Sequence, residues 1–226
     1  MGRVKKPNRI AEGWEDWAQS GYPLPGEGVH HAMMPYARSS AALARAKGKE
    51  GETFREAAVL VGIESDGRIV LIQRTQEKGP HGGQMALPGG AREAKESLRD
   101  CAIREWREEL GLNALCAPVR EPVPLTEVHV VPSGFVVRPF LAEVALPESL
   151  EPEEREVARV YRIHLNDLVD PQYRTKHPVR VHAPGAQNFR WDAPGFALPD
   201  TPFIWGATAL ILSEVAAWTE RWVCRP

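Results

Sequence analysis

Three glutamates, Glu105, Glu108 and Glu109, stand at relative positions i, i+3 and i+4 of this 226-residue chain. On an α-helix these positions share one face, so the three carboxylates would lie close together. Like charges on one face repel each other, which makes the cluster unfavourable as packing alone. Mg²⁺ takes oxygen ligands and is usually shared with a substrate phosphate. The spacing therefore predicts a divalent-metal site that acts on a phosphate compound.

A solvated helix face is the alternative explanation of these glutamates, because exposed helices commonly carry glutamate–arginine pairs four residues apart. The position of Arg104 favours the metal site. Arg104 directly precedes Glu105 and lies four residues before Glu108. Its guanidinium can therefore fix a carboxylate rotamer through a charge-assisted hydrogen bond. The glycines and the further glutamate that flank the cluster point the same way.

The stretch 90–112 reads GAREAKESLRDCAIREWREELGL and resembles the Nudix box, G-x5-E-x7-R-E-U-x-E-E-x-G-U, where U is a bulky aliphatic residue. Every fixed position of the box matches. The matching residues are Gly90, Glu96, Arg104, Glu105, Glu108, Glu109 and Gly111. Trp106 departs from the pattern, because it stands where Ile, Leu or Val is usual, but it keeps the position bulky and apolar.

The resemblance implies a hydrolase of diphosphate linkages that uses Mg²⁺ or Mn²⁺. It implies that the metal is held by Glu105, Glu108, Glu109 and the carbonyl of Gly90, with Glu96 acting through water or steadying the loop. Catalytic roles would fall to Glu105, Arg104 and Glu109. One carboxylate must serve as general base: Glu105 is the first choice, and Glu156 or Glu154, in an acidic loop further along the chain, is the second.

A second motif precedes the box. Residues 70–90 read VLIQRTQEKGPHGGQMALPGG and resemble the segment before the box in the coenzyme A diphosphatase branch of the family, L-L-T-x-R-[SA]-x3-R-x3-G-x3-F-P-G-G. The matches are Arg74, Gly83, Pro88, Gly89 and Gly90, and the departures are Thr75, Gly79 and Leu87. His81 and Gln84 agree with a His-x-Gly-Gln stretch that is common there. The resemblance implies substrate binding by Arg74, His81, Gln84 and Gly89.

The end of the chain carries a third resemblance to the same branch. Residues 204–209 read IWGATA, similar to the I-W-G-x-T-A that begins its last helix. Trp205 has core packing as its simpler explanation. The loss of an arginine at Gly79 removes one charge-assisted contact, which is typically worth ~1.5–3 kcal/mol. Coenzyme A specificity is therefore supported by fewer matching residues than family membership is.

The candidate site residues must be positioned by helices and strands. Apolar runs at 57–63 and 68–74 around Ser65-Asp66-Gly67 predict a β-hairpin. A helix is expected from Ser97, its N-cap, to Leu110, with Gly111 ending it. The other expected elements are helices near 10–19 and 38–47, strands at 125–131, 134–145 and 157–163, a turn or short helix at 164–169, an irregular region at 171–202 with a hairpin at 179–191, and a helix at 206–222.

The family resemblance implies an α/β fold: an α/β/α sandwich with a mixed central sheet and a loop–helix–loop box. We expect residues 56–226 to form this domain. Residues 1–55 are expected to be an N-terminal extension that packs on the core or caps the site. The pair His30-His31 within it is interpreted as a surface pair, because no third metal ligand is spaced nearby.

Composition limits the partners. The net charge is −2, from 28 basic and 30 acidic residues, so no field of one sign would draw the chain to nucleic acid or to an anionic membrane. Three cysteines without a CxxC pair fit a reduced cytoplasm. No signal core or membrane span is evident. The expected partner is a small nucleotide-diphosphate substrate, and a homodimer stays open.

Three functions are weighed. The first is hydrolysis of coenzyme A or acyl-coenzyme A to 3′,5′-ADP and 4′-phosphopantetheine or its acyl form. The second is hydrolysis of another substrate, such as an NDP-sugar, ADP-ribose, a dinucleotide or a damaged nucleotide. The third is a non-catalytic binding or regulatory module, which retention of every box carboxylate disfavours.

Overall fold

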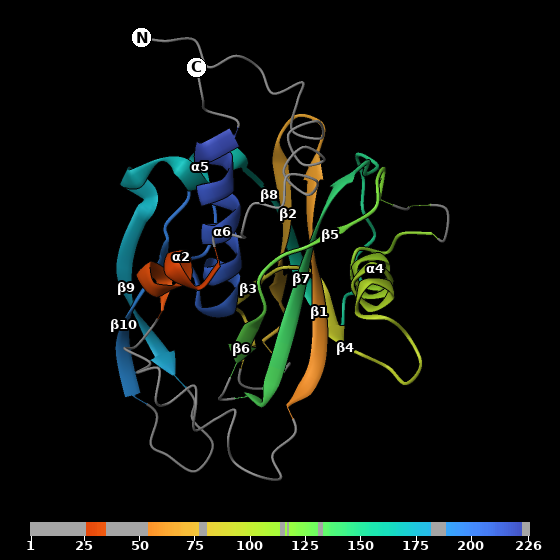
Figure 1. Ribbon diagram of the computed structural model, residues 1–226, viewed down its shortest axis with the longest axis horizontal. Helices are drawn as coiled ribbons and strands as arrows, with labels where there is room; N and C mark the ends of the chain where they lie inside the picture. The colour runs from red at the N-terminus through yellow and green to blue at the C-terminus, as the bar shows by residue number, and fades with distance from the viewer. Residues whose placement is uncertain are drawn as a thin grey trace.

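The fold is an α/β/α sandwich around one mixed β-sheet, as expected from the sequence (Figure 1). The computed structural model describes residues 26–34, 54–76, 81–113, 116, 118–130, 133–181 and 189–222. The helices are α2 (Gly26–Met33), α4 (Leu98–Glu109), α5 (Leu165–Val169), the 3₁₀ helix η3 (Pro171–Tyr173) and α6 (Gly206–Trp222). The strands are β1 (Arg55–Glu64), β2 (Arg68–Arg74), β3 (Met85–Ala86), β4 (Gly89–Ala91), β5 (Val123–Pro124), β6 (Val128–Val130), β7 (Phe135–Val144), β8 (Val157–His164), β9 (Arg174–Val181), β10 (Phe189–Phe196) and β11 (Ile204–Trp205).

The central sheet is built around β1, which pairs in parallel with β7 along its whole length and antiparallel with β2 and β4. β2 also pairs with β3 and β8, while β5 and β6 pair with β7. The β1–β2 hairpin is confirmed, with Gly67 in the left-handed region (φ +88°) at its turn. β1 thereby lies between β4 and β7.

Each face of this sheet has its own hydrophobic core. On one face α4 packs its buried Trp106 and Cys101 against β1, together with Leu60 and Phe140. On the other face α6 packs with α2 and α5 over residues such as Leu71 and Leu141. Figure 1 shows α4 on one side of the sheet and α6 with α2 on the opposite side. Trp106 keeps the packing of the box helix, as expected for a bulky apolar residue, and Cys101 is a core residue too: both are completely buried.

In the region 171–202 the hairpin expected at 179–191 is confirmed, but the chain around it is more regular than expected. It forms a long antiparallel hairpin, β9–β10, paired from Arg174–Phe196 to Val181–Phe189, and β11 extends it to a second, three-stranded sheet. Its prolines misled the prediction, because proline normally excludes a central strand. Pro178 lies on the edge strand β9, and Pro194 pairs with Lys176 just beyond the part of β10 that β11 covers.

Two further expectations need correction, and two lie outside the described residues. The strand expected at 125–131 is only Val128–Val130, because the backbone N–H of Thr126 donates to the Glu214 carboxylate. His30 is not a surface residue: it is 3% exposed, whereas His31 is exposed. The helices expected near 10–19 and 38–47 fall on residues that the structure does not describe. No helix in the described part of the chain is long and apolar enough to cross a membrane.

Candidate active site

The box helix α4 begins and ends at residues that its sequence specifies. The Ser97 side chain caps it by accepting a hydrogen bond from the Asp100 N–H (3.1 Å), which satisfies an otherwise unpaired N–H of the first turn. At the other end Gly111 takes φ +64°, a conformation that favours glycine. A side chain at Gly111 would also collide with the carbonyl of Glu151. The helix end is therefore fitted closely to the acidic loop at 151–156.

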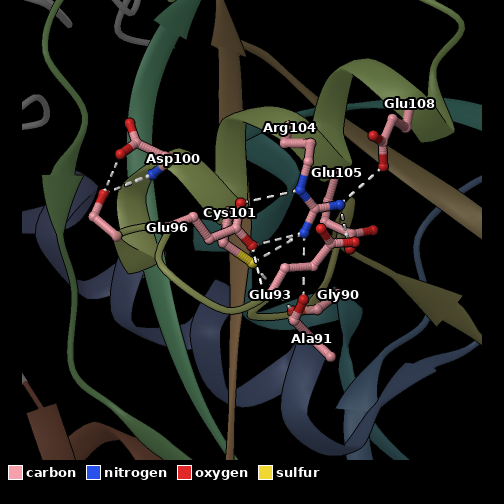
Figure 2. Close-up of polar contacts among 10 residues, drawn as sticks. Gly90, Ala91, Glu93, Glu96, Asp100, Cys101, Arg104, Glu105 and Glu108 are labelled. Carbon is pink, nitrogen blue, oxygen red and sulfur yellow. Dashed lines mark hydrogen bonds and ion pairs between the residues drawn. The ribbon is translucent and has the colours of Figure 1, made fainter.

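Arg104 is the centre of the polar network on α4 (Figure 2). Its guanidinium donates to both oxygens of Glu96 (Nε–Oε2 3.1 Å and Nη2–Oε1 2.8 Å) and through Nη1 to Glu105 and Glu108, each at 2.9 Å. Glu96 also accepts from the Glu93 N–H at 2.7 Å. The hydrogen bond from Arg104 lowers the pKa of Glu96 to about 2. Arg104 thus holds one carboxylate of the loop and two of the helix in fixed orientations.

Glu109 is a buried carboxylate facing the β4 strand. It is 2% exposed, and its Oε2 accepts a hydrogen bond from the Gly89 N–H at 2.8 Å. Its other oxygen lies 3.9 Å from Nη1 of Arg74. Burial raises the pKa of Glu109 to about 7, although the Gly89 N–H and the Arg74 charge oppose the rise. A buried carboxylate with so little compensation is well suited to bind a cation.

Glu105 lies against the backbone of β4. A Cβ atom at Gly90 would overlap the Glu105 carboxyl group, so the glycine of the box leaves space for this side chain. Burial raises the pKa of Glu105, while Arg104 lowers it and the neighbouring charges of Glu108 and Glu156 raise it. Glu108 differs, because its side chain is 60% exposed and turned toward Arg104.

The acidic loop reaches the same place through strand pairing. β8 pairs antiparallel with β2, and the Thr75 N–H donates to the Glu156 carbonyl at 3.0 Å. Glu156 is close enough to Glu109 for its charge to raise the pKa of that group. Glu154 is exposed and lies outside the cleft lining. Of the two loop candidates for general base, only Glu156 lies at the site.

These residues open into one cavity of about 910 Å³, which we call the active-site cleft. The predicted site residues that line it are Arg74, His81, Gln84, Gly89, Gly90, Arg104, Glu105, Glu108, Glu109 and Glu156. His81 and Gln84 contact each other (Nδ1···Oε1 3.3 Å) on a loop that folds back on the Arg74 backbone. Glu96 is not in the lining and stands behind Arg104.

The cleft also contains residues that the sequence-based reasoning did not single out as site residues. Met34, which follows α2, lines it, as do Val128 and His129 of β6. Trp205, for which core packing was the simpler explanation, is partly exposed and lines the cleft with Gly206. Periodicity could not reveal Met34 or β6 as cleft residues, since only tertiary packing brings them there.

The donor set fits a hard divalent cation. Carboxylates of α4 and the carbonyl of Gly90 lie in one cleft, and oxygen is the ligand type that Mg²⁺ and Mn²⁺ select. Among the described residues, no three acidic, histidine or cysteine side chains already converge as a metal cage. Glu105 and Glu108 are instead oriented by Arg104, whose guanidinium neutralises them.

Comparison with known proteins identifies the family of the chain. A family model described as NUDIX domain matches residues 50–183. A protein named uncharacterized Nudix hydrolase NudL, from Citrobacter koseri, is 30% identical over 171 residues, which are 74% of this chain and 84% of the relative. A relative of the same name from Salmonella newport is 30% identical over 165 residues, 72% of this chain and 81% of its own.

Two solved structures of MutT proteins align with about half of the chain. The MutT NUDIX hydrolase from Burkholderia pseudomallei is 29% identical, with a TM-score of 0.41, over 52% of this chain and 88% of its own. The MutT protein from Methanosarcina mazei Go1 is 18% identical, with a TM-score of 0.41, over 53% and 83%. By the family model and the curated relatives, the chain belongs to the Nudix family of hydrolases, enzymes that act on nucleoside diphosphate derivatives.

Proposed function

We propose that this enzyme hydrolyses the diphosphate linkage of coenzyme A or acyl-coenzyme A, giving 3′,5′-ADP and 4′-phosphopantetheine or its acyl form. One observation carries the proposal. Two sequence segments that resemble the coenzyme A diphosphatase branch, at 70–90 and 204–209, contribute to the lining of a single cleft together with the Nudix box at 90–112. Residues 204–209 lie far from the other two segments in the chain and have no structural need to share a cavity with them.

The assignment of roles follows the Nudix box residue by residue. Glu105, Glu108, Glu109 and the Gly90 carbonyl would hold Mg²⁺ or Mn²⁺, which when bound neutralises phosphate oxygens and lowers the pKa of a water. Arg104 orients Glu105 and Glu108, and Glu96 holds Arg104 in turn. Arg74 places a positive charge beside Glu109, where a substrate phosphate could exchange with the carboxylate. Positioning and electrostatics then supply most of the catalysis.

Glu105 is the first candidate for general base and Glu156 the second. Both line the cleft, and burial raises the pKa of Glu105 above its usual value, which makes this carboxylate a stronger base. Glu105→Gln and Glu156→Gln separate the two: the base variant should lose turnover and the pH dependence of kcat/KM on the acidic side. Glu148→Gln, on an exposed stretch, is the control.

A substrate panel tests the proposal. Phosphate-containing products should be measured for coenzyme A, ADP-ribose, NADH and NDP-sugars with Mg²⁺ and with Mn²⁺. We expect the highest kcat/KM for coenzyme A or an acyl-coenzyme A. A clear preference for ADP-ribose or an NDP-sugar would replace the proposal with the second candidate, which Gly79 favours because it stands where the coenzyme A motif has arginine.

A non-catalytic role has one direct test. Glu109→Gln should reduce turnover by orders of magnitude while the protein stays folded, because it removes a buried anion from the cleft. Wild-type turnover in this variant would contradict the metal assignment. The absence of turnover in the wild-type protein on every substrate, with both metals, would favour the binding module.

A further inference from the structure

The active-site cleft has two parts of opposite chemistry. One part holds the carboxylates of α4 beside Gly89 and Gly90. The other part, which we call the apolar arm, is lined by Met34, Val59, Val128, Val130, Leu210 and Ile211. Val59 connects the two, since it pairs across the strands with Gly89, the N–H donor to Glu109. A diphosphate at the carboxylates would therefore direct one of its substituents toward an aliphatic surface.

α2 places Met34, the residue that follows it, in the wall of the apolar arm, and three contacts fix the helix in place. At its start, Gly26 lies over the Thr126 side chain. In its middle, buried His30 lies with Nε2 3.4 Å from Oε2 of Glu214, without hydrogen-bond geometry. At its end Met33 is 4% exposed in the core. Met34, the next residue, is only partly buried and lines the cleft.

The apolar arm also depends on segments outside the family match. The family model covers residues 50–183, whereas Met34 precedes it and Leu210 and Ile211 follow it on α6. The carboxylate part, by contrast, lies wholly inside the match. Half of the arm's six residues thus lie outside the family match, whereas Val59, Val128 and Val130 lie inside it.

We propose that Met34 is a specificity-determining residue that binds an aliphatic substituent of the diphosphate substrate in the apolar arm. This inference rests on the proposed function, in that the diphosphate is placed at the α4 carboxylates. Burial of a methylene group is worth about 0.8 kcal/mol, which is roughly a fourfold gain in affinity at full burial. Affinity should therefore rise with the length of the aliphatic substituent, and the rise should depend on Met34.

The test measures binding of n-alkyl diphosphates, from methyl to octyl, by calorimetry with Mg²⁺ present. For the wild type we expect affinity to increase with each added methylene, by up to about fourfold. Met34→Gln should bind methyl diphosphate like the wild type but octyl diphosphate about tenfold more weakly, since an amide replaces an apolar wall. Met34→Leu should retain the wild-type dependence.

His31→Gln is the matched control, because His31 is exposed on the same helix and is not in the cleft lining. Thermal unfolding of each variant excludes loss of fold as the cause. If the wild type shows no dependence on chain length, or Met34→Gln keeps the full dependence, the inference is overturned. An affinity that changes equally for methyl and octyl diphosphate in Met34→Gln would also overturn it.

Kinetics separate this inference from the proposed function. With coenzyme A and octanoyl-coenzyme A, Met34→Gln should raise KM for the acyl substrate with little change in kcat, as expected for loss of binding that is equal in ground and transition states. If coenzyme A compounds are not hydrolysed but octyl diphosphate binding depends on Met34, the proposed function fails and the inference stands. If they are hydrolysed but Met34→Gln leaves both dependences unchanged, the inference alone fails.

Discussion

At the scale of single residues, the site depends on one arginine surrounded by carboxylates. Arg104 donates to Glu96 with two nitrogens and to Glu105 and Glu108 with a third. These hydrogen bonds raise the pKa of Arg104 further above its usual value. The planar guanidinium of arginine is needed here, because the ammonium group of a lysine cannot bond both oxygens of one carboxylate in a bidentate pair. The residue therefore positions the carboxylates that we propose as metal ligands.

Arg104→Lys should consequently weaken the site without unfolding the protein. Loss of a group that orients metal ligands typically costs 10–100-fold in metal affinity or activity, and we expect an effect of about that size here. The measurements are the Mg²⁺ dependence of turnover and a Mg²⁺ binding titration. Arg107→Lys is the control on the same helix, where Arg107 bonds the Cys116 carbonyl instead of the carboxylates. Equal Mg²⁺ dependence in Arg104→Lys and the wild type would contradict this role.

Glu109 makes a second prediction, which concerns the metal-free protein. Burial raises its pKa to about 7 from 4.5, so the folded state binds a proton more tightly than the unfolded state. The free energy of unfolding should therefore fall as pH rises from about 4.5 to 7, by about 3 kcal/mol from this group. Glu109→Gln cannot ionise and should lose this contribution to the pH dependence.

Urea unfolding in EDTA at pH 5 and pH 8 measures this effect. The difference in unfolding free energy between Glu109→Gln and the wild type should favour the variant more at pH 8 than at pH 5, by about 3 kcal/mol. Glu148→Gln, on an exposed stretch, should follow the wild type. Parallel pH profiles of Glu109→Gln and the wild type would show that the native carboxyl is not desolvated.

At the scale of elements, the junction between α4 and the acidic loop decides where Glu156 lies. Gly111 has φ +64°, and any Cβ there would meet the Glu151 carbonyl. Gly134, in the turn before β7, has nearly the same angle, φ +66°, but nothing within 4 Å of its Cβ position. A substitution at Gly134 therefore costs only the unfavourable backbone conformation, whereas a substitution at Gly111 adds the collision with Glu151.

Gly134→Ala should lose about 1–2 kcal/mol of unfolding free energy, the cost of the left-handed conformation for a residue with a side chain. Gly111→Ala should lose clearly more, and it should also lower kcat, because the loop must move away from Glu109. Urea unfolding and steady-state kinetics on both variants give the comparison. Equal losses of stability, with kcat unchanged in Gly111→Ala, would mean that the loop adapts freely.

The elements that the sequence predicts well are those with local signals. α4 has an N-cap, an apolar stripe and a terminal glycine, and the β1–β2 hairpin has a turn between two apolar runs; both are confirmed. The hairpin expected at 179–191 is confirmed by the pairs Val179 with Trp191 and Val181 with Phe189, but its extension to Arg174 and Phe196 was missed because Pro178 and Pro194 suggest irregular chain. α2 was missed because Gly26, which opens it, belongs to a Gly- and Pro-rich stretch and its stability comes from packing on α6.

The residues of the candidate site also fall into those that local motifs predict and those that only tertiary packing places there. Residues within the motifs, such as Glu105 and Arg74, could be named from spacing and resemblance, and the structure brings them to one cleft. Of the loop glutamates, only strand register decides that Glu156 faces the cleft and Glu154 does not. Met34 carries no motif at all. Its place depends on the contacts of α2 with α6, which no local pattern encodes.

At the scale of the whole molecule, a buried polar cluster joins three segments that are far apart in the sequence. Glu214 of α6 is fully buried and accepts hydrogen bonds from the Thr126 N–H (3.2 Å) and hydroxyl (2.8 Å). His30 of α2 lies 3.4 Å from the same carboxylate. The cluster therefore connects α2, the chain before β6 and α6, and the apolar arm is lined by Met34 after α2, by Val128 of β6 and by Leu210 of α6.

Loss of Glu214 should affect all three segments together. Removing one partner of a buried polar cluster leaves the others desolvated, so Glu214→Ala should lose about 3–5 kcal/mol of unfolding free energy. Glu214→Gln can still accept from Thr126 and should lose less. In a double-mutant cycle, Glu214→Ala and His30→Ala should be coupled by about 0.5–3 kcal/mol, because they share one contact. Additive losses would mean that His30 packs on α6 without contributing through Glu214, and α2 would then be held by Met33 and the Gly26 contact alone.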